Sequence, residues 1–182
     1  MALAKQRRIK TTLMDRPFTS HSPFSTPMTS KLVSLPVWFE NHVRALFDVS
    51  DSDVDFEALF DATFAKDTTF VQNGTNASRD DVKQALGGQR GFSSNITVTF
   101  GEIIEAPLKD GDEVVSGAGV VAGKLRVTRF SKFLVHDVRQ KTETSVFFIT
   151  TIRPDPTLPS DQGQDNRRVV NNNEVVTNAP NN

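Results

Sequence analysis

Few side chains in this chain can carry acid–base or nucleophilic chemistry, and this restricts the reactions it could catalyse. The 182 residues include three His, 14 Phe and one Trp, but no Cys and no Tyr. The missing Cys excludes a thiolate nucleophile, a thiolate zinc site and a disulfide scaffold. The missing Tyr excludes a phenol as an acid or as a donor to a developing oxyanion. Proton transfer would therefore depend on His, Asp and Glu side chains.

His42 is the candidate general base. It lies in the middle of the apolar side of a predicted helix over residues 35–49, between Phe39 and Leu46, and Trp38 is on the same side. An apolar cavity next to this histidine would lower its pKa and keep the ring neutral, so that it could accept a proton. A core histidine that bonds to the backbone would show the same pattern, and both interpretations stay open.

Further candidate ligand-binding residues lie on or after predicted strands. Gln72 and Asn73 end a short extended run and could orient a ligand by hydrogen bonds. Arg126 alternates with Thr128 along a later strand, where it either orients an anion inside the fold or faces outward. Phe148 lies in a strongly β-prone run and adds to an apolar wall, as does Trp38.

The sequence offers no pattern typical of a metal or cofactor site. No two His have the spacing of metal ligands, and no strand carries a cluster of acids. The glycine-rich segment 87–91 follows a predicted helix instead of preceding one, which is typical of a helix end and not of a phosphate loop. We therefore expect no metal and no cofactor.

The hydrophobic periodicity predicts an α+β fold in which three N-terminal helices precede a curved antiparallel sheet. The segment 131–141 is predicted to be an irregular link, and the glycine pair at 87–88 is predicted to end the third helix. We expect one domain over residues 36–153, followed by an extension over 154–182. That extension contains one edge strand or hairpin at 168–176 and then a disordered Asn-rich tail. The predicted helices cover 35–49, 56–64 and 78–86, and the main predicted strands cover 68–72, 96–100, 113–130 and 144–153.

The charge is divided unevenly along the chain. Residues 1–35 carry six basic side chains and one Asp, whereas residues 36–182 carry 15 basic and 21 acidic side chains. The acidic body has no basic stripe, so we expect no nucleic-acid partner. No apolar run is long enough to span a bilayer, so we expect no membrane partner. We expect an intracellular, cytoplasmic protein with a disordered Ser/Thr/Pro-rich arm over residues 1–35, which could also act as a mitochondrial import signal.

The segment Phe56–Phe70 resembles a known family, the nuclear transport factor 2-like superfamily, which includes the SnoaL-like cyclases and ketosteroid isomerase. This segment is similar to the second helix of that family running into an aspartate, here Asp67, before the first strand. Asn73-Gly74 followed by Ser78–Val82 resembles the loop and third helix that come next. The resemblance covers residues 36–153. It implies a cone-shaped sheet wrapped around three helices, with an apolar cavity at the wide end, and a homodimer formed through the outer sheet face.

The resemblance does not carry over the catalytic residues of the isomerase branch. The position of its carboxylate base falls on Gln72, whose amide cannot accept a proton, and its Tyr has no counterpart in this chain. We therefore expect a SnoaL-like pocket protein that binds a small apolar metabolite. Isomerase, cyclase or dehydratase activity would then use His42 as base. The alternative is a non-catalytic dimeric interaction module whose own Phe side chains fill the cone.

Overall fold

The computed structural model describes residues 32–49, 55–158 and 165–179, and the arm predicted over residues 1–35 lies almost entirely outside these ranges. The described residues form three helices and six strands; two helices come first, then two strands, the third helix and four further strands. The helices are α1 (Leu35–Phe47), α2 (Phe56–Thr63) and α3 (Arg79–Phe92); the strands are β1 (Phe64–Gln72), β2 (Thr75–Ala77), β3 (Ser93–Asp110), β4 (Glu113–Val135), β5 (Val138–Pro154) and β6 (Arg167–Asn178).

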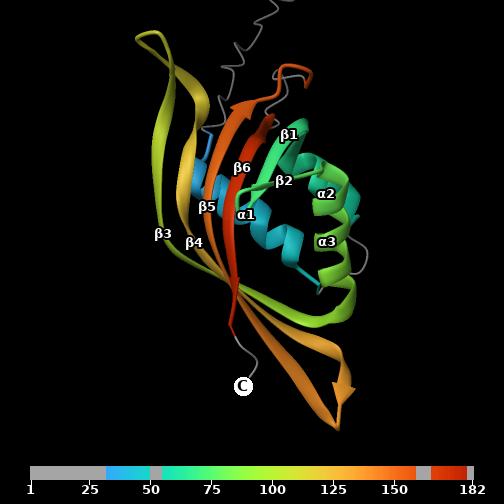
Figure 1. Ribbon diagram of the computed structural model, residues 1–182. Coiled ribbons are helices and arrows are strands. Elements are labelled where there is room, and N and C mark those ends of the chain that lie inside the picture. Colours follow the sequence, from blue (N-terminus) through green and yellow to red (C-terminus); the bar gives the residue numbers. More distant parts are fainter. Residues whose placement is uncertain (1–31, 50–54, 159–164, 180–182) are drawn as a thin grey trace, which may run out of the picture.

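The strands form one sheet that curls around the helices (Figure 1). The strand order is β2-β1-β6-β5-β4-β3. Four neighbouring pairs are antiparallel, while β1 and β6 are parallel, so the sheet is mixed and not wholly antiparallel. Three helices lie on the concave side of a long curved sheet, which confirms the predicted α+β class and its cone-like arrangement.

Local capping residues set where the helices begin. Pro36 occupies the first turn of α1, where its missing N–H would have no helical partner. Asp55 caps α2 by accepting a hydrogen bond from the Glu57 N–H at 2.9 Å. The Ser78 hydroxyl accepts the Asp81 N–H at 3.1 Å and caps α3, as the sequence predicts. Each helix therefore starts at a local signal that can be read from the sequence.

Helix α3 runs further than predicted. The glycine pair at 87–88 was expected to end it, but the helix continues to Phe92. A side-chain carbon at Gly87 would lie 3.3 Å from Cε1 of the Phe56 ring. The glycine therefore lets α3 approach α2 closely, and its role in packing explains its presence better than a helix stop.

The hydrophobic core lies between α1, α2 and the concave face of the sheet. Trp38 and Phe39 of α1 are 2% and 4% exposed, and Phe60 of α2 is fully buried. The Phe60 ring is 4.8 Å from the Phe64 ring, and Phe64 is 5.1 Å from Phe70 on β1. The Phe-rich segment that resembles the family therefore forms a continuous aromatic cluster where α2 leads into the sheet.

Close packing at the sheet also requires glycine. A side-chain carbon at Gly119 would lie 2.4 Å from Cδ1 of Leu35 and 2.8 Å from the Ala106 carbonyl oxygen. Any larger residue there would force α1 and β3 away from β4. The glycine-containing strand predicted from the sequence is thus placed where a helix rests directly on the backbone of the sheet.

The C-terminal strand was predicted at 168–176 as an edge strand or hairpin, and its edge position is wrong. β6 lies inside the sheet, parallel to β1 on one side and antiparallel to β5 on the other. Its polar residues suggested an edge, but they have partners across the strands: the Thr150 hydroxyl donates to Oδ1 of Asn172 at 2.7 Å, and the Thr68 hydroxyl donates to the Val169 carbonyl at 2.7 Å.

The segment 131–141 is also more regular than predicted. β4 and β5 extend through it and meet at a two-residue turn formed by His136 and Asp137, both with positive φ. Val135 pairs with Val138 across this turn. A tight turn of this kind matches the twist of the flanking strands, and the resulting hairpin projects beyond the body of the protein (Figure 1).

Candidate functional site

A cavity of about 280 Å³ lies between α1, α3 and the concave face of the sheet. Its walls are mostly apolar, because the amphipathic sides of both helices and the inward side chains of the central strands converge on it. The apolar walls consist of Phe39, Val43, Leu46 and Phe47 from α1, Val82, Ala85 and Leu86 from α3, and Phe64, Ala77, Leu125, Val127, Val146 and Phe148 from the sheet.

One end of the cavity is polar, and Glu174 is at its centre. In the sheet register, Glu174 of β6 pairs with Gln72 of β1 on one side and with Phe148 of β5 on the other. Gln72, Asn172 and Glu174 all line the cavity. Three neighbouring strands therefore bring an amide, a carboxyl group and an aromatic ring together in one row, although they are far apart in the sequence.

Hydrogen bonds hold the Glu174 carboxylate in place. Nε2 of Gln72 donates to Oε1 of Glu174 at 2.8 Å. The side chain of Asn172 also bonds to Glu174, and its orientation is fixed because its Oδ1 accepts from the buried Thr150 hydroxyl at 2.7 Å. The carboxylate is therefore held by two neutral donors, one from the neighbouring strand β1 and one from β6 itself.

The environment of Glu174 disfavours its negative charge. Burial raises the pKa of the Glu174 carboxyl group above its ordinary value, and the hydrogen bonds from Gln72 and Asn172 only partly oppose this effect. Asp81, at the start of α3, is the other acid that lines the cavity, and the lining includes no Lys, Arg or His. A carboxyl group with a raised pKa in an apolar cavity is typical of a functional site.

Two of the predicted ligand-binding residues line this cavity and a third supports it. Gln72 and Phe148 are both part of the wall. Asn73, next to Gln72, lies outside the lining and has a φ of 51°. Its N–H donates to the Glu174 carbonyl at 2.9 Å, and its Oδ1 accepts the Val176 N–H at 2.8 Å. Asn73 thus ties β1 to β6 around Glu174.

His42 and Trp38 lie on α1 but outside the cavity lining. Nδ1 of His42 is 2.8 Å from the Trp38 carbonyl oxygen, and the two rings stack at 3.9 Å. Burial lowers the pKa of His42, as expected, while the bond to the Trp38 carbonyl opposes that shift. The role of His42 as a base stays a prediction, since its ring packs on Trp38 instead of bordering the cavity.

Arg126 is on the opposite face of the sheet from the cavity. Its neighbours Leu125 and Val127 are buried and line the cavity, so the alternation along β4 turns the exposed Arg126 outward. The outward orientation, which the sequence left open for Arg126, is the one observed.

Glu174 is the residue that sequence reasoning missed. The Asn-rich surroundings made residues 171–176 resemble an edge strand and a tail. The only available signal was the period of two that places Asn172, Glu174 and Val176 on one face. That signal does not reveal which neighbouring strands would enclose the carboxyl group.

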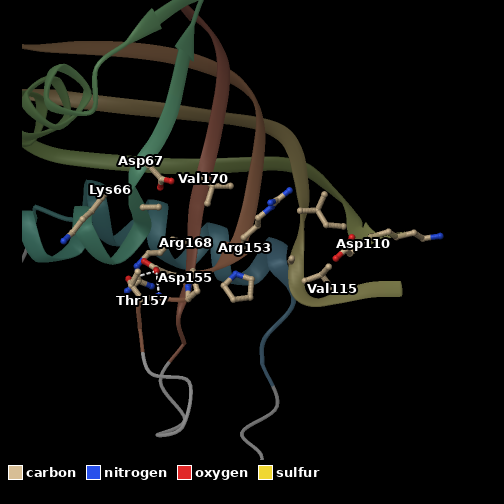
Figure 2. A pocket seen from close by; sticks show the side chains of 15 residues that line it. Lys66, Asp67, Asp110, Val115, Arg153, Asp155, Thr157, Arg168 and Val170 are labelled. Atoms are coloured by element: carbon tan, nitrogen blue, oxygen red, sulfur yellow. Dashed lines mark hydrogen bonds between the residues drawn. The ribbon is translucent and has the colours of Figure 1, made fainter. Parts of the chain in front are cut away.

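A second, larger hollow of about 810 Å³ lies on the outer face of the sheet (Figure 2). Arg153 and Arg168, which pair across β5 and β6, line it beside Asp67 and Asp155. The Asp155 carboxylate accepts bonds from the Thr157 N–H at 2.9 Å and hydroxyl at 2.6 Å, which fixes a local turn. The charges in this hollow are mixed and partly used within the fold, so we regard the inner cavity as the candidate site.

The described residues contain no group of three or more His, Cys, Asp or Glu side chains placed to hold a metal ion. Within the same ranges, no helix is long and apolar enough to cross a bilayer.

Comparisons with known proteins identify the fold. No protein-family model and no curated protein matches the sequence. Among solved structures, the chain is similar to IdmH from Streptomyces antibioticus, for which polyketide cyclase activity is proposed. The TM-score is 0.50 at 13% identity, covering 80% of this chain and 92% of IdmH.

The chain is also similar to the C. albicans Mtr2–Mex67 M domain complex, with a TM-score of 0.50 at 11% identity. This match covers 81% of this chain and 96% of the matched chain. The chain therefore has the nuclear transport factor 2-like fold, as its sequence resemblance implies. At this level of identity the likeness concerns the fold alone, and function has to be argued from the site.

Proposed function

We propose that this protein binds a small, largely apolar molecule in the inner cavity, with the polar group of that molecule at Glu174. The observation that carries the proposal is an apolar cavity of about 280 Å³ with a half-buried carboxyl group at one end. This volume lies just below the range of about 300–1,000 Å³ that ligand sites usually have, which suits a small ligand. The combination favours a ligand-binding cone over one filled by its own side chains.

Glu174 is also the group through which acid–base chemistry would run in this cavity. A carboxyl group whose pKa is raised above its ordinary value is a better proton acceptor than an ordinary carboxylate. Glu174 lines the cavity, and hydrogen bonds from Gln72 and Asn172 hold its carboxylate. Isomerisation, cyclisation or dehydration of a bound molecule would therefore use Glu174 as the proton acceptor, in the role that the sequence assigned to His42.

A cavity-filling variant tests the binding proposal. Val146 lines the cavity from β5, so Val146→Phe should fill space that the ligand needs. Val138→Phe adds the same volume on the exposed β4–β5 hairpin and is the matched control. We expect native mass spectrometry of protein purified from its source to find a bound small molecule in the wild type and the control.

The same measurement should find no bound molecule in Val146→Phe, with thermal unfolding confirming that this variant is folded. An empty wild-type cavity, or equal occupancy in folded Val146→Phe, would contradict the proposal.

We further propose that the protein forms a homodimer through the outer sheet face. The supporting observation is a group of apolar side chains, each half or more exposed, that line one shallow hollow on this face: Ile104, Phe147, Ile149 and Val175. A contiguous exposed apolar patch is typical of an interaction surface. Analytical ultracentrifugation tests this proposal. Ile149→Lys should sediment as a monomer, while the control Val138→Lys should remain dimeric like the wild type. A monomeric wild type would refute the dimer.

A further inference from the structure

We propose that the molecule bound in the inner cavity is a compact apolar amine whose ammonium group pairs with the Glu174 carboxylate. This inference rests on the proposed function of the cavity and names the chemical class of its ligand. The argument concerns charge, hydrogen-bonding capacity and the shape of the apolar walls, in that order.

The charges that line the cavity are of one sign. Glu174 contributes a half-buried carboxylate and Asp81 an exposed one that accepts the Ser78 hydroxyl at 2.6 Å, and none of the described residues that line the cavity is a Lys, an Arg or a His. Charges that are removed from water are normally paired with an opposite charge. Within the described residues, the Glu174 carboxylate forms no ion pair and accepts hydrogen bonds only from the neutral side-chain amides of Gln72 and Asn172. A cation inside the cavity would supply the missing compensation.

The Glu174 carboxylate also has bonding capacity left. A carboxylate offers about four lone-pair positions on its two oxygens. One donor comes from Gln72 and one from Asn172. An ammonium group carries three N–H donors, and hydrogen bonds between charged partners are roughly twice as strong as neutral ones. An amine can therefore add to the existing arrangement without displacing either amide.

The remainder of the cavity requires an apolar body. Phe39 and Phe148, whose rings are 4.7 Å apart, form part of one wall, and Val127, Val146 and Leu86 are other wall residues. These side chains offer no partner to a second polar group, which could bond only to Gln89 or Asp81 on the α3 side of the lining. An anionic ligand would in addition be repelled by Glu174 and Asp81.

The experiment compares three probes of nearly equal shape at pH 7.5. These are 2-phenylethylamine, 2-phenylethanol and phenylacetate, measured by isothermal titration calorimetry against the wild type and Glu174→Gln. Glu143→Gln is the matched control, because Glu143 lies outside the cavity and pairs with Lys141 at 2.6 Å. The wild type should bind the amine at least about tenfold more tightly than the alcohol, which corresponds to about 1.4 kcal/mol, and should bind phenylacetate most weakly.

In Glu174→Gln the preference for the amine over the alcohol should fall to about twofold or less, with affinity for the alcohol retained, whereas Glu143→Gln should keep the wild-type preference. Equal wild-type affinities for amine and alcohol, or a preference that survives in Glu174→Gln, would overturn the amine inference and leave the binding proposal standing. If no probe binds and native mass spectrometry also finds the cavity empty, the binding proposal itself fails, and the amine inference with it.

Discussion

The carboxylates of Asp165 and Glu174 lie toward opposite ends of β6, and their pKa values are shifted in opposite directions. Asp165, just before the strand, accepts bonds from Nε of Arg167 to both of its oxygens, at 2.8 and 3.1 Å. Glu174, near the other end, accepts bonds from neutral amides only. Burial would raise the pKa of both groups. The bonds and charge of Arg167 outweigh burial at Asp165 and lower its pKa, whereas the pKa of Glu174 stays raised.

This difference means that Asp165 has a structural role, whereas the Glu174 carboxylate is available to a ligand. Arg167 is almost fully buried, and its Nη1 also donates to the Val33 carbonyl at 2.8 Å. The Asp165–Arg167 pair therefore ties the start of β6 to the segment that leads into α1. Among the described residues, no cation forms an ion pair with Glu174, which lines a cavity. A carboxylate that the fold has already paired is unavailable for binding, while an uncompensated one is a candidate partner for a ligand.

We expect the largest change in the free energy of unfolding when the charge of Asp165 is removed. Asp165→Asn keeps an oxygen that can accept from Arg167 but leaves a buried guanidinium without its counter-ion. We expect the free energy of unfolding to fall by about 3 kcal/mol, as is typical when one partner of a buried ion pair is lost. Urea denaturation measures this change. A loss no larger than that of an exposed pair, below about 1 kcal/mol, would show that the two carboxylates are not different in this way.

Removing the charge of Glu174 should change the free energy of unfolding by less, and in the opposite direction. Because folding raises the pKa of Glu174, its charged form is less favourable in the folded state than in the unfolded one, and Glu174→Gln should be as stable as the wild type or slightly more stable at pH 7. The folded wild type holds its proton to higher pH. Its stability relative to Glu174→Gln should therefore increase as the pH falls through the folded pKa, and level off below the unfolded value of about 4.3.

Thermal or urea unfolding of both proteins across pH 4–8 measures that difference. Comparing the variant with the wild type cancels His42, whose lowered pKa acts in the opposite direction: it costs stability as the pH falls below the ordinary value for histidine. A wild type that loses stability relative to Glu174→Gln on acidification would place Glu174 in the same class as Asp165.

The smallest effect should follow from removing one amide donor. Gln72→Leu deletes the hydrogen bond to Oε1 of Glu174, so the pKa of Glu174 should rise further, because that bond favours the charged form. Gln89→Leu is the matched control, since Gln89 lines the same cavity from α3 without a side-chain bond to Glu174. An NMR titration of the Glu174 carboxyl carbon measures both pKa values; equal values in the two variants would mean that Gln72 does not hold the carboxylate.

Much of the fold could be predicted from local patterns. The beginnings of α2 and α3, at Phe56 and Arg79, follow from capping residues next to an apolar period, which are signals carried by a few consecutive residues. The end of α3 and the regular β4–β5 hairpin could not be predicted, because both depend on contacts with distant residues. Gly87 appears to be a helix stop until the ring of Phe56 is placed against it.

The candidate site was predictable only in part. Gln72 and Phe148 were named from the sequence and do line the cavity. His42 was expected to point into the cavity, but its ring packs on Trp38 and is not part of the cavity lining. A helical period gives the side of the helix that faces the core, yet it does not tell which part of the core is left open.

The sequence by itself determined the class of fold, the exclusion of thiol and phenol chemistry, and the resemblance to the nuclear transport factor 2-like superfamily. These properties depend on composition and on the pattern of residues that are close together in the sequence. Only the tertiary structure decided which carboxylate lacks a counter-ion. Glu174 and Asp165 are both acids in a polar C-terminal segment, and the pairing of β6 between β1 and β5 places one beside a cavity and the other beside Arg167. The pKa of a carboxyl group depends on the charges and solvent that surround it in space, and strand pairing sets those surroundings.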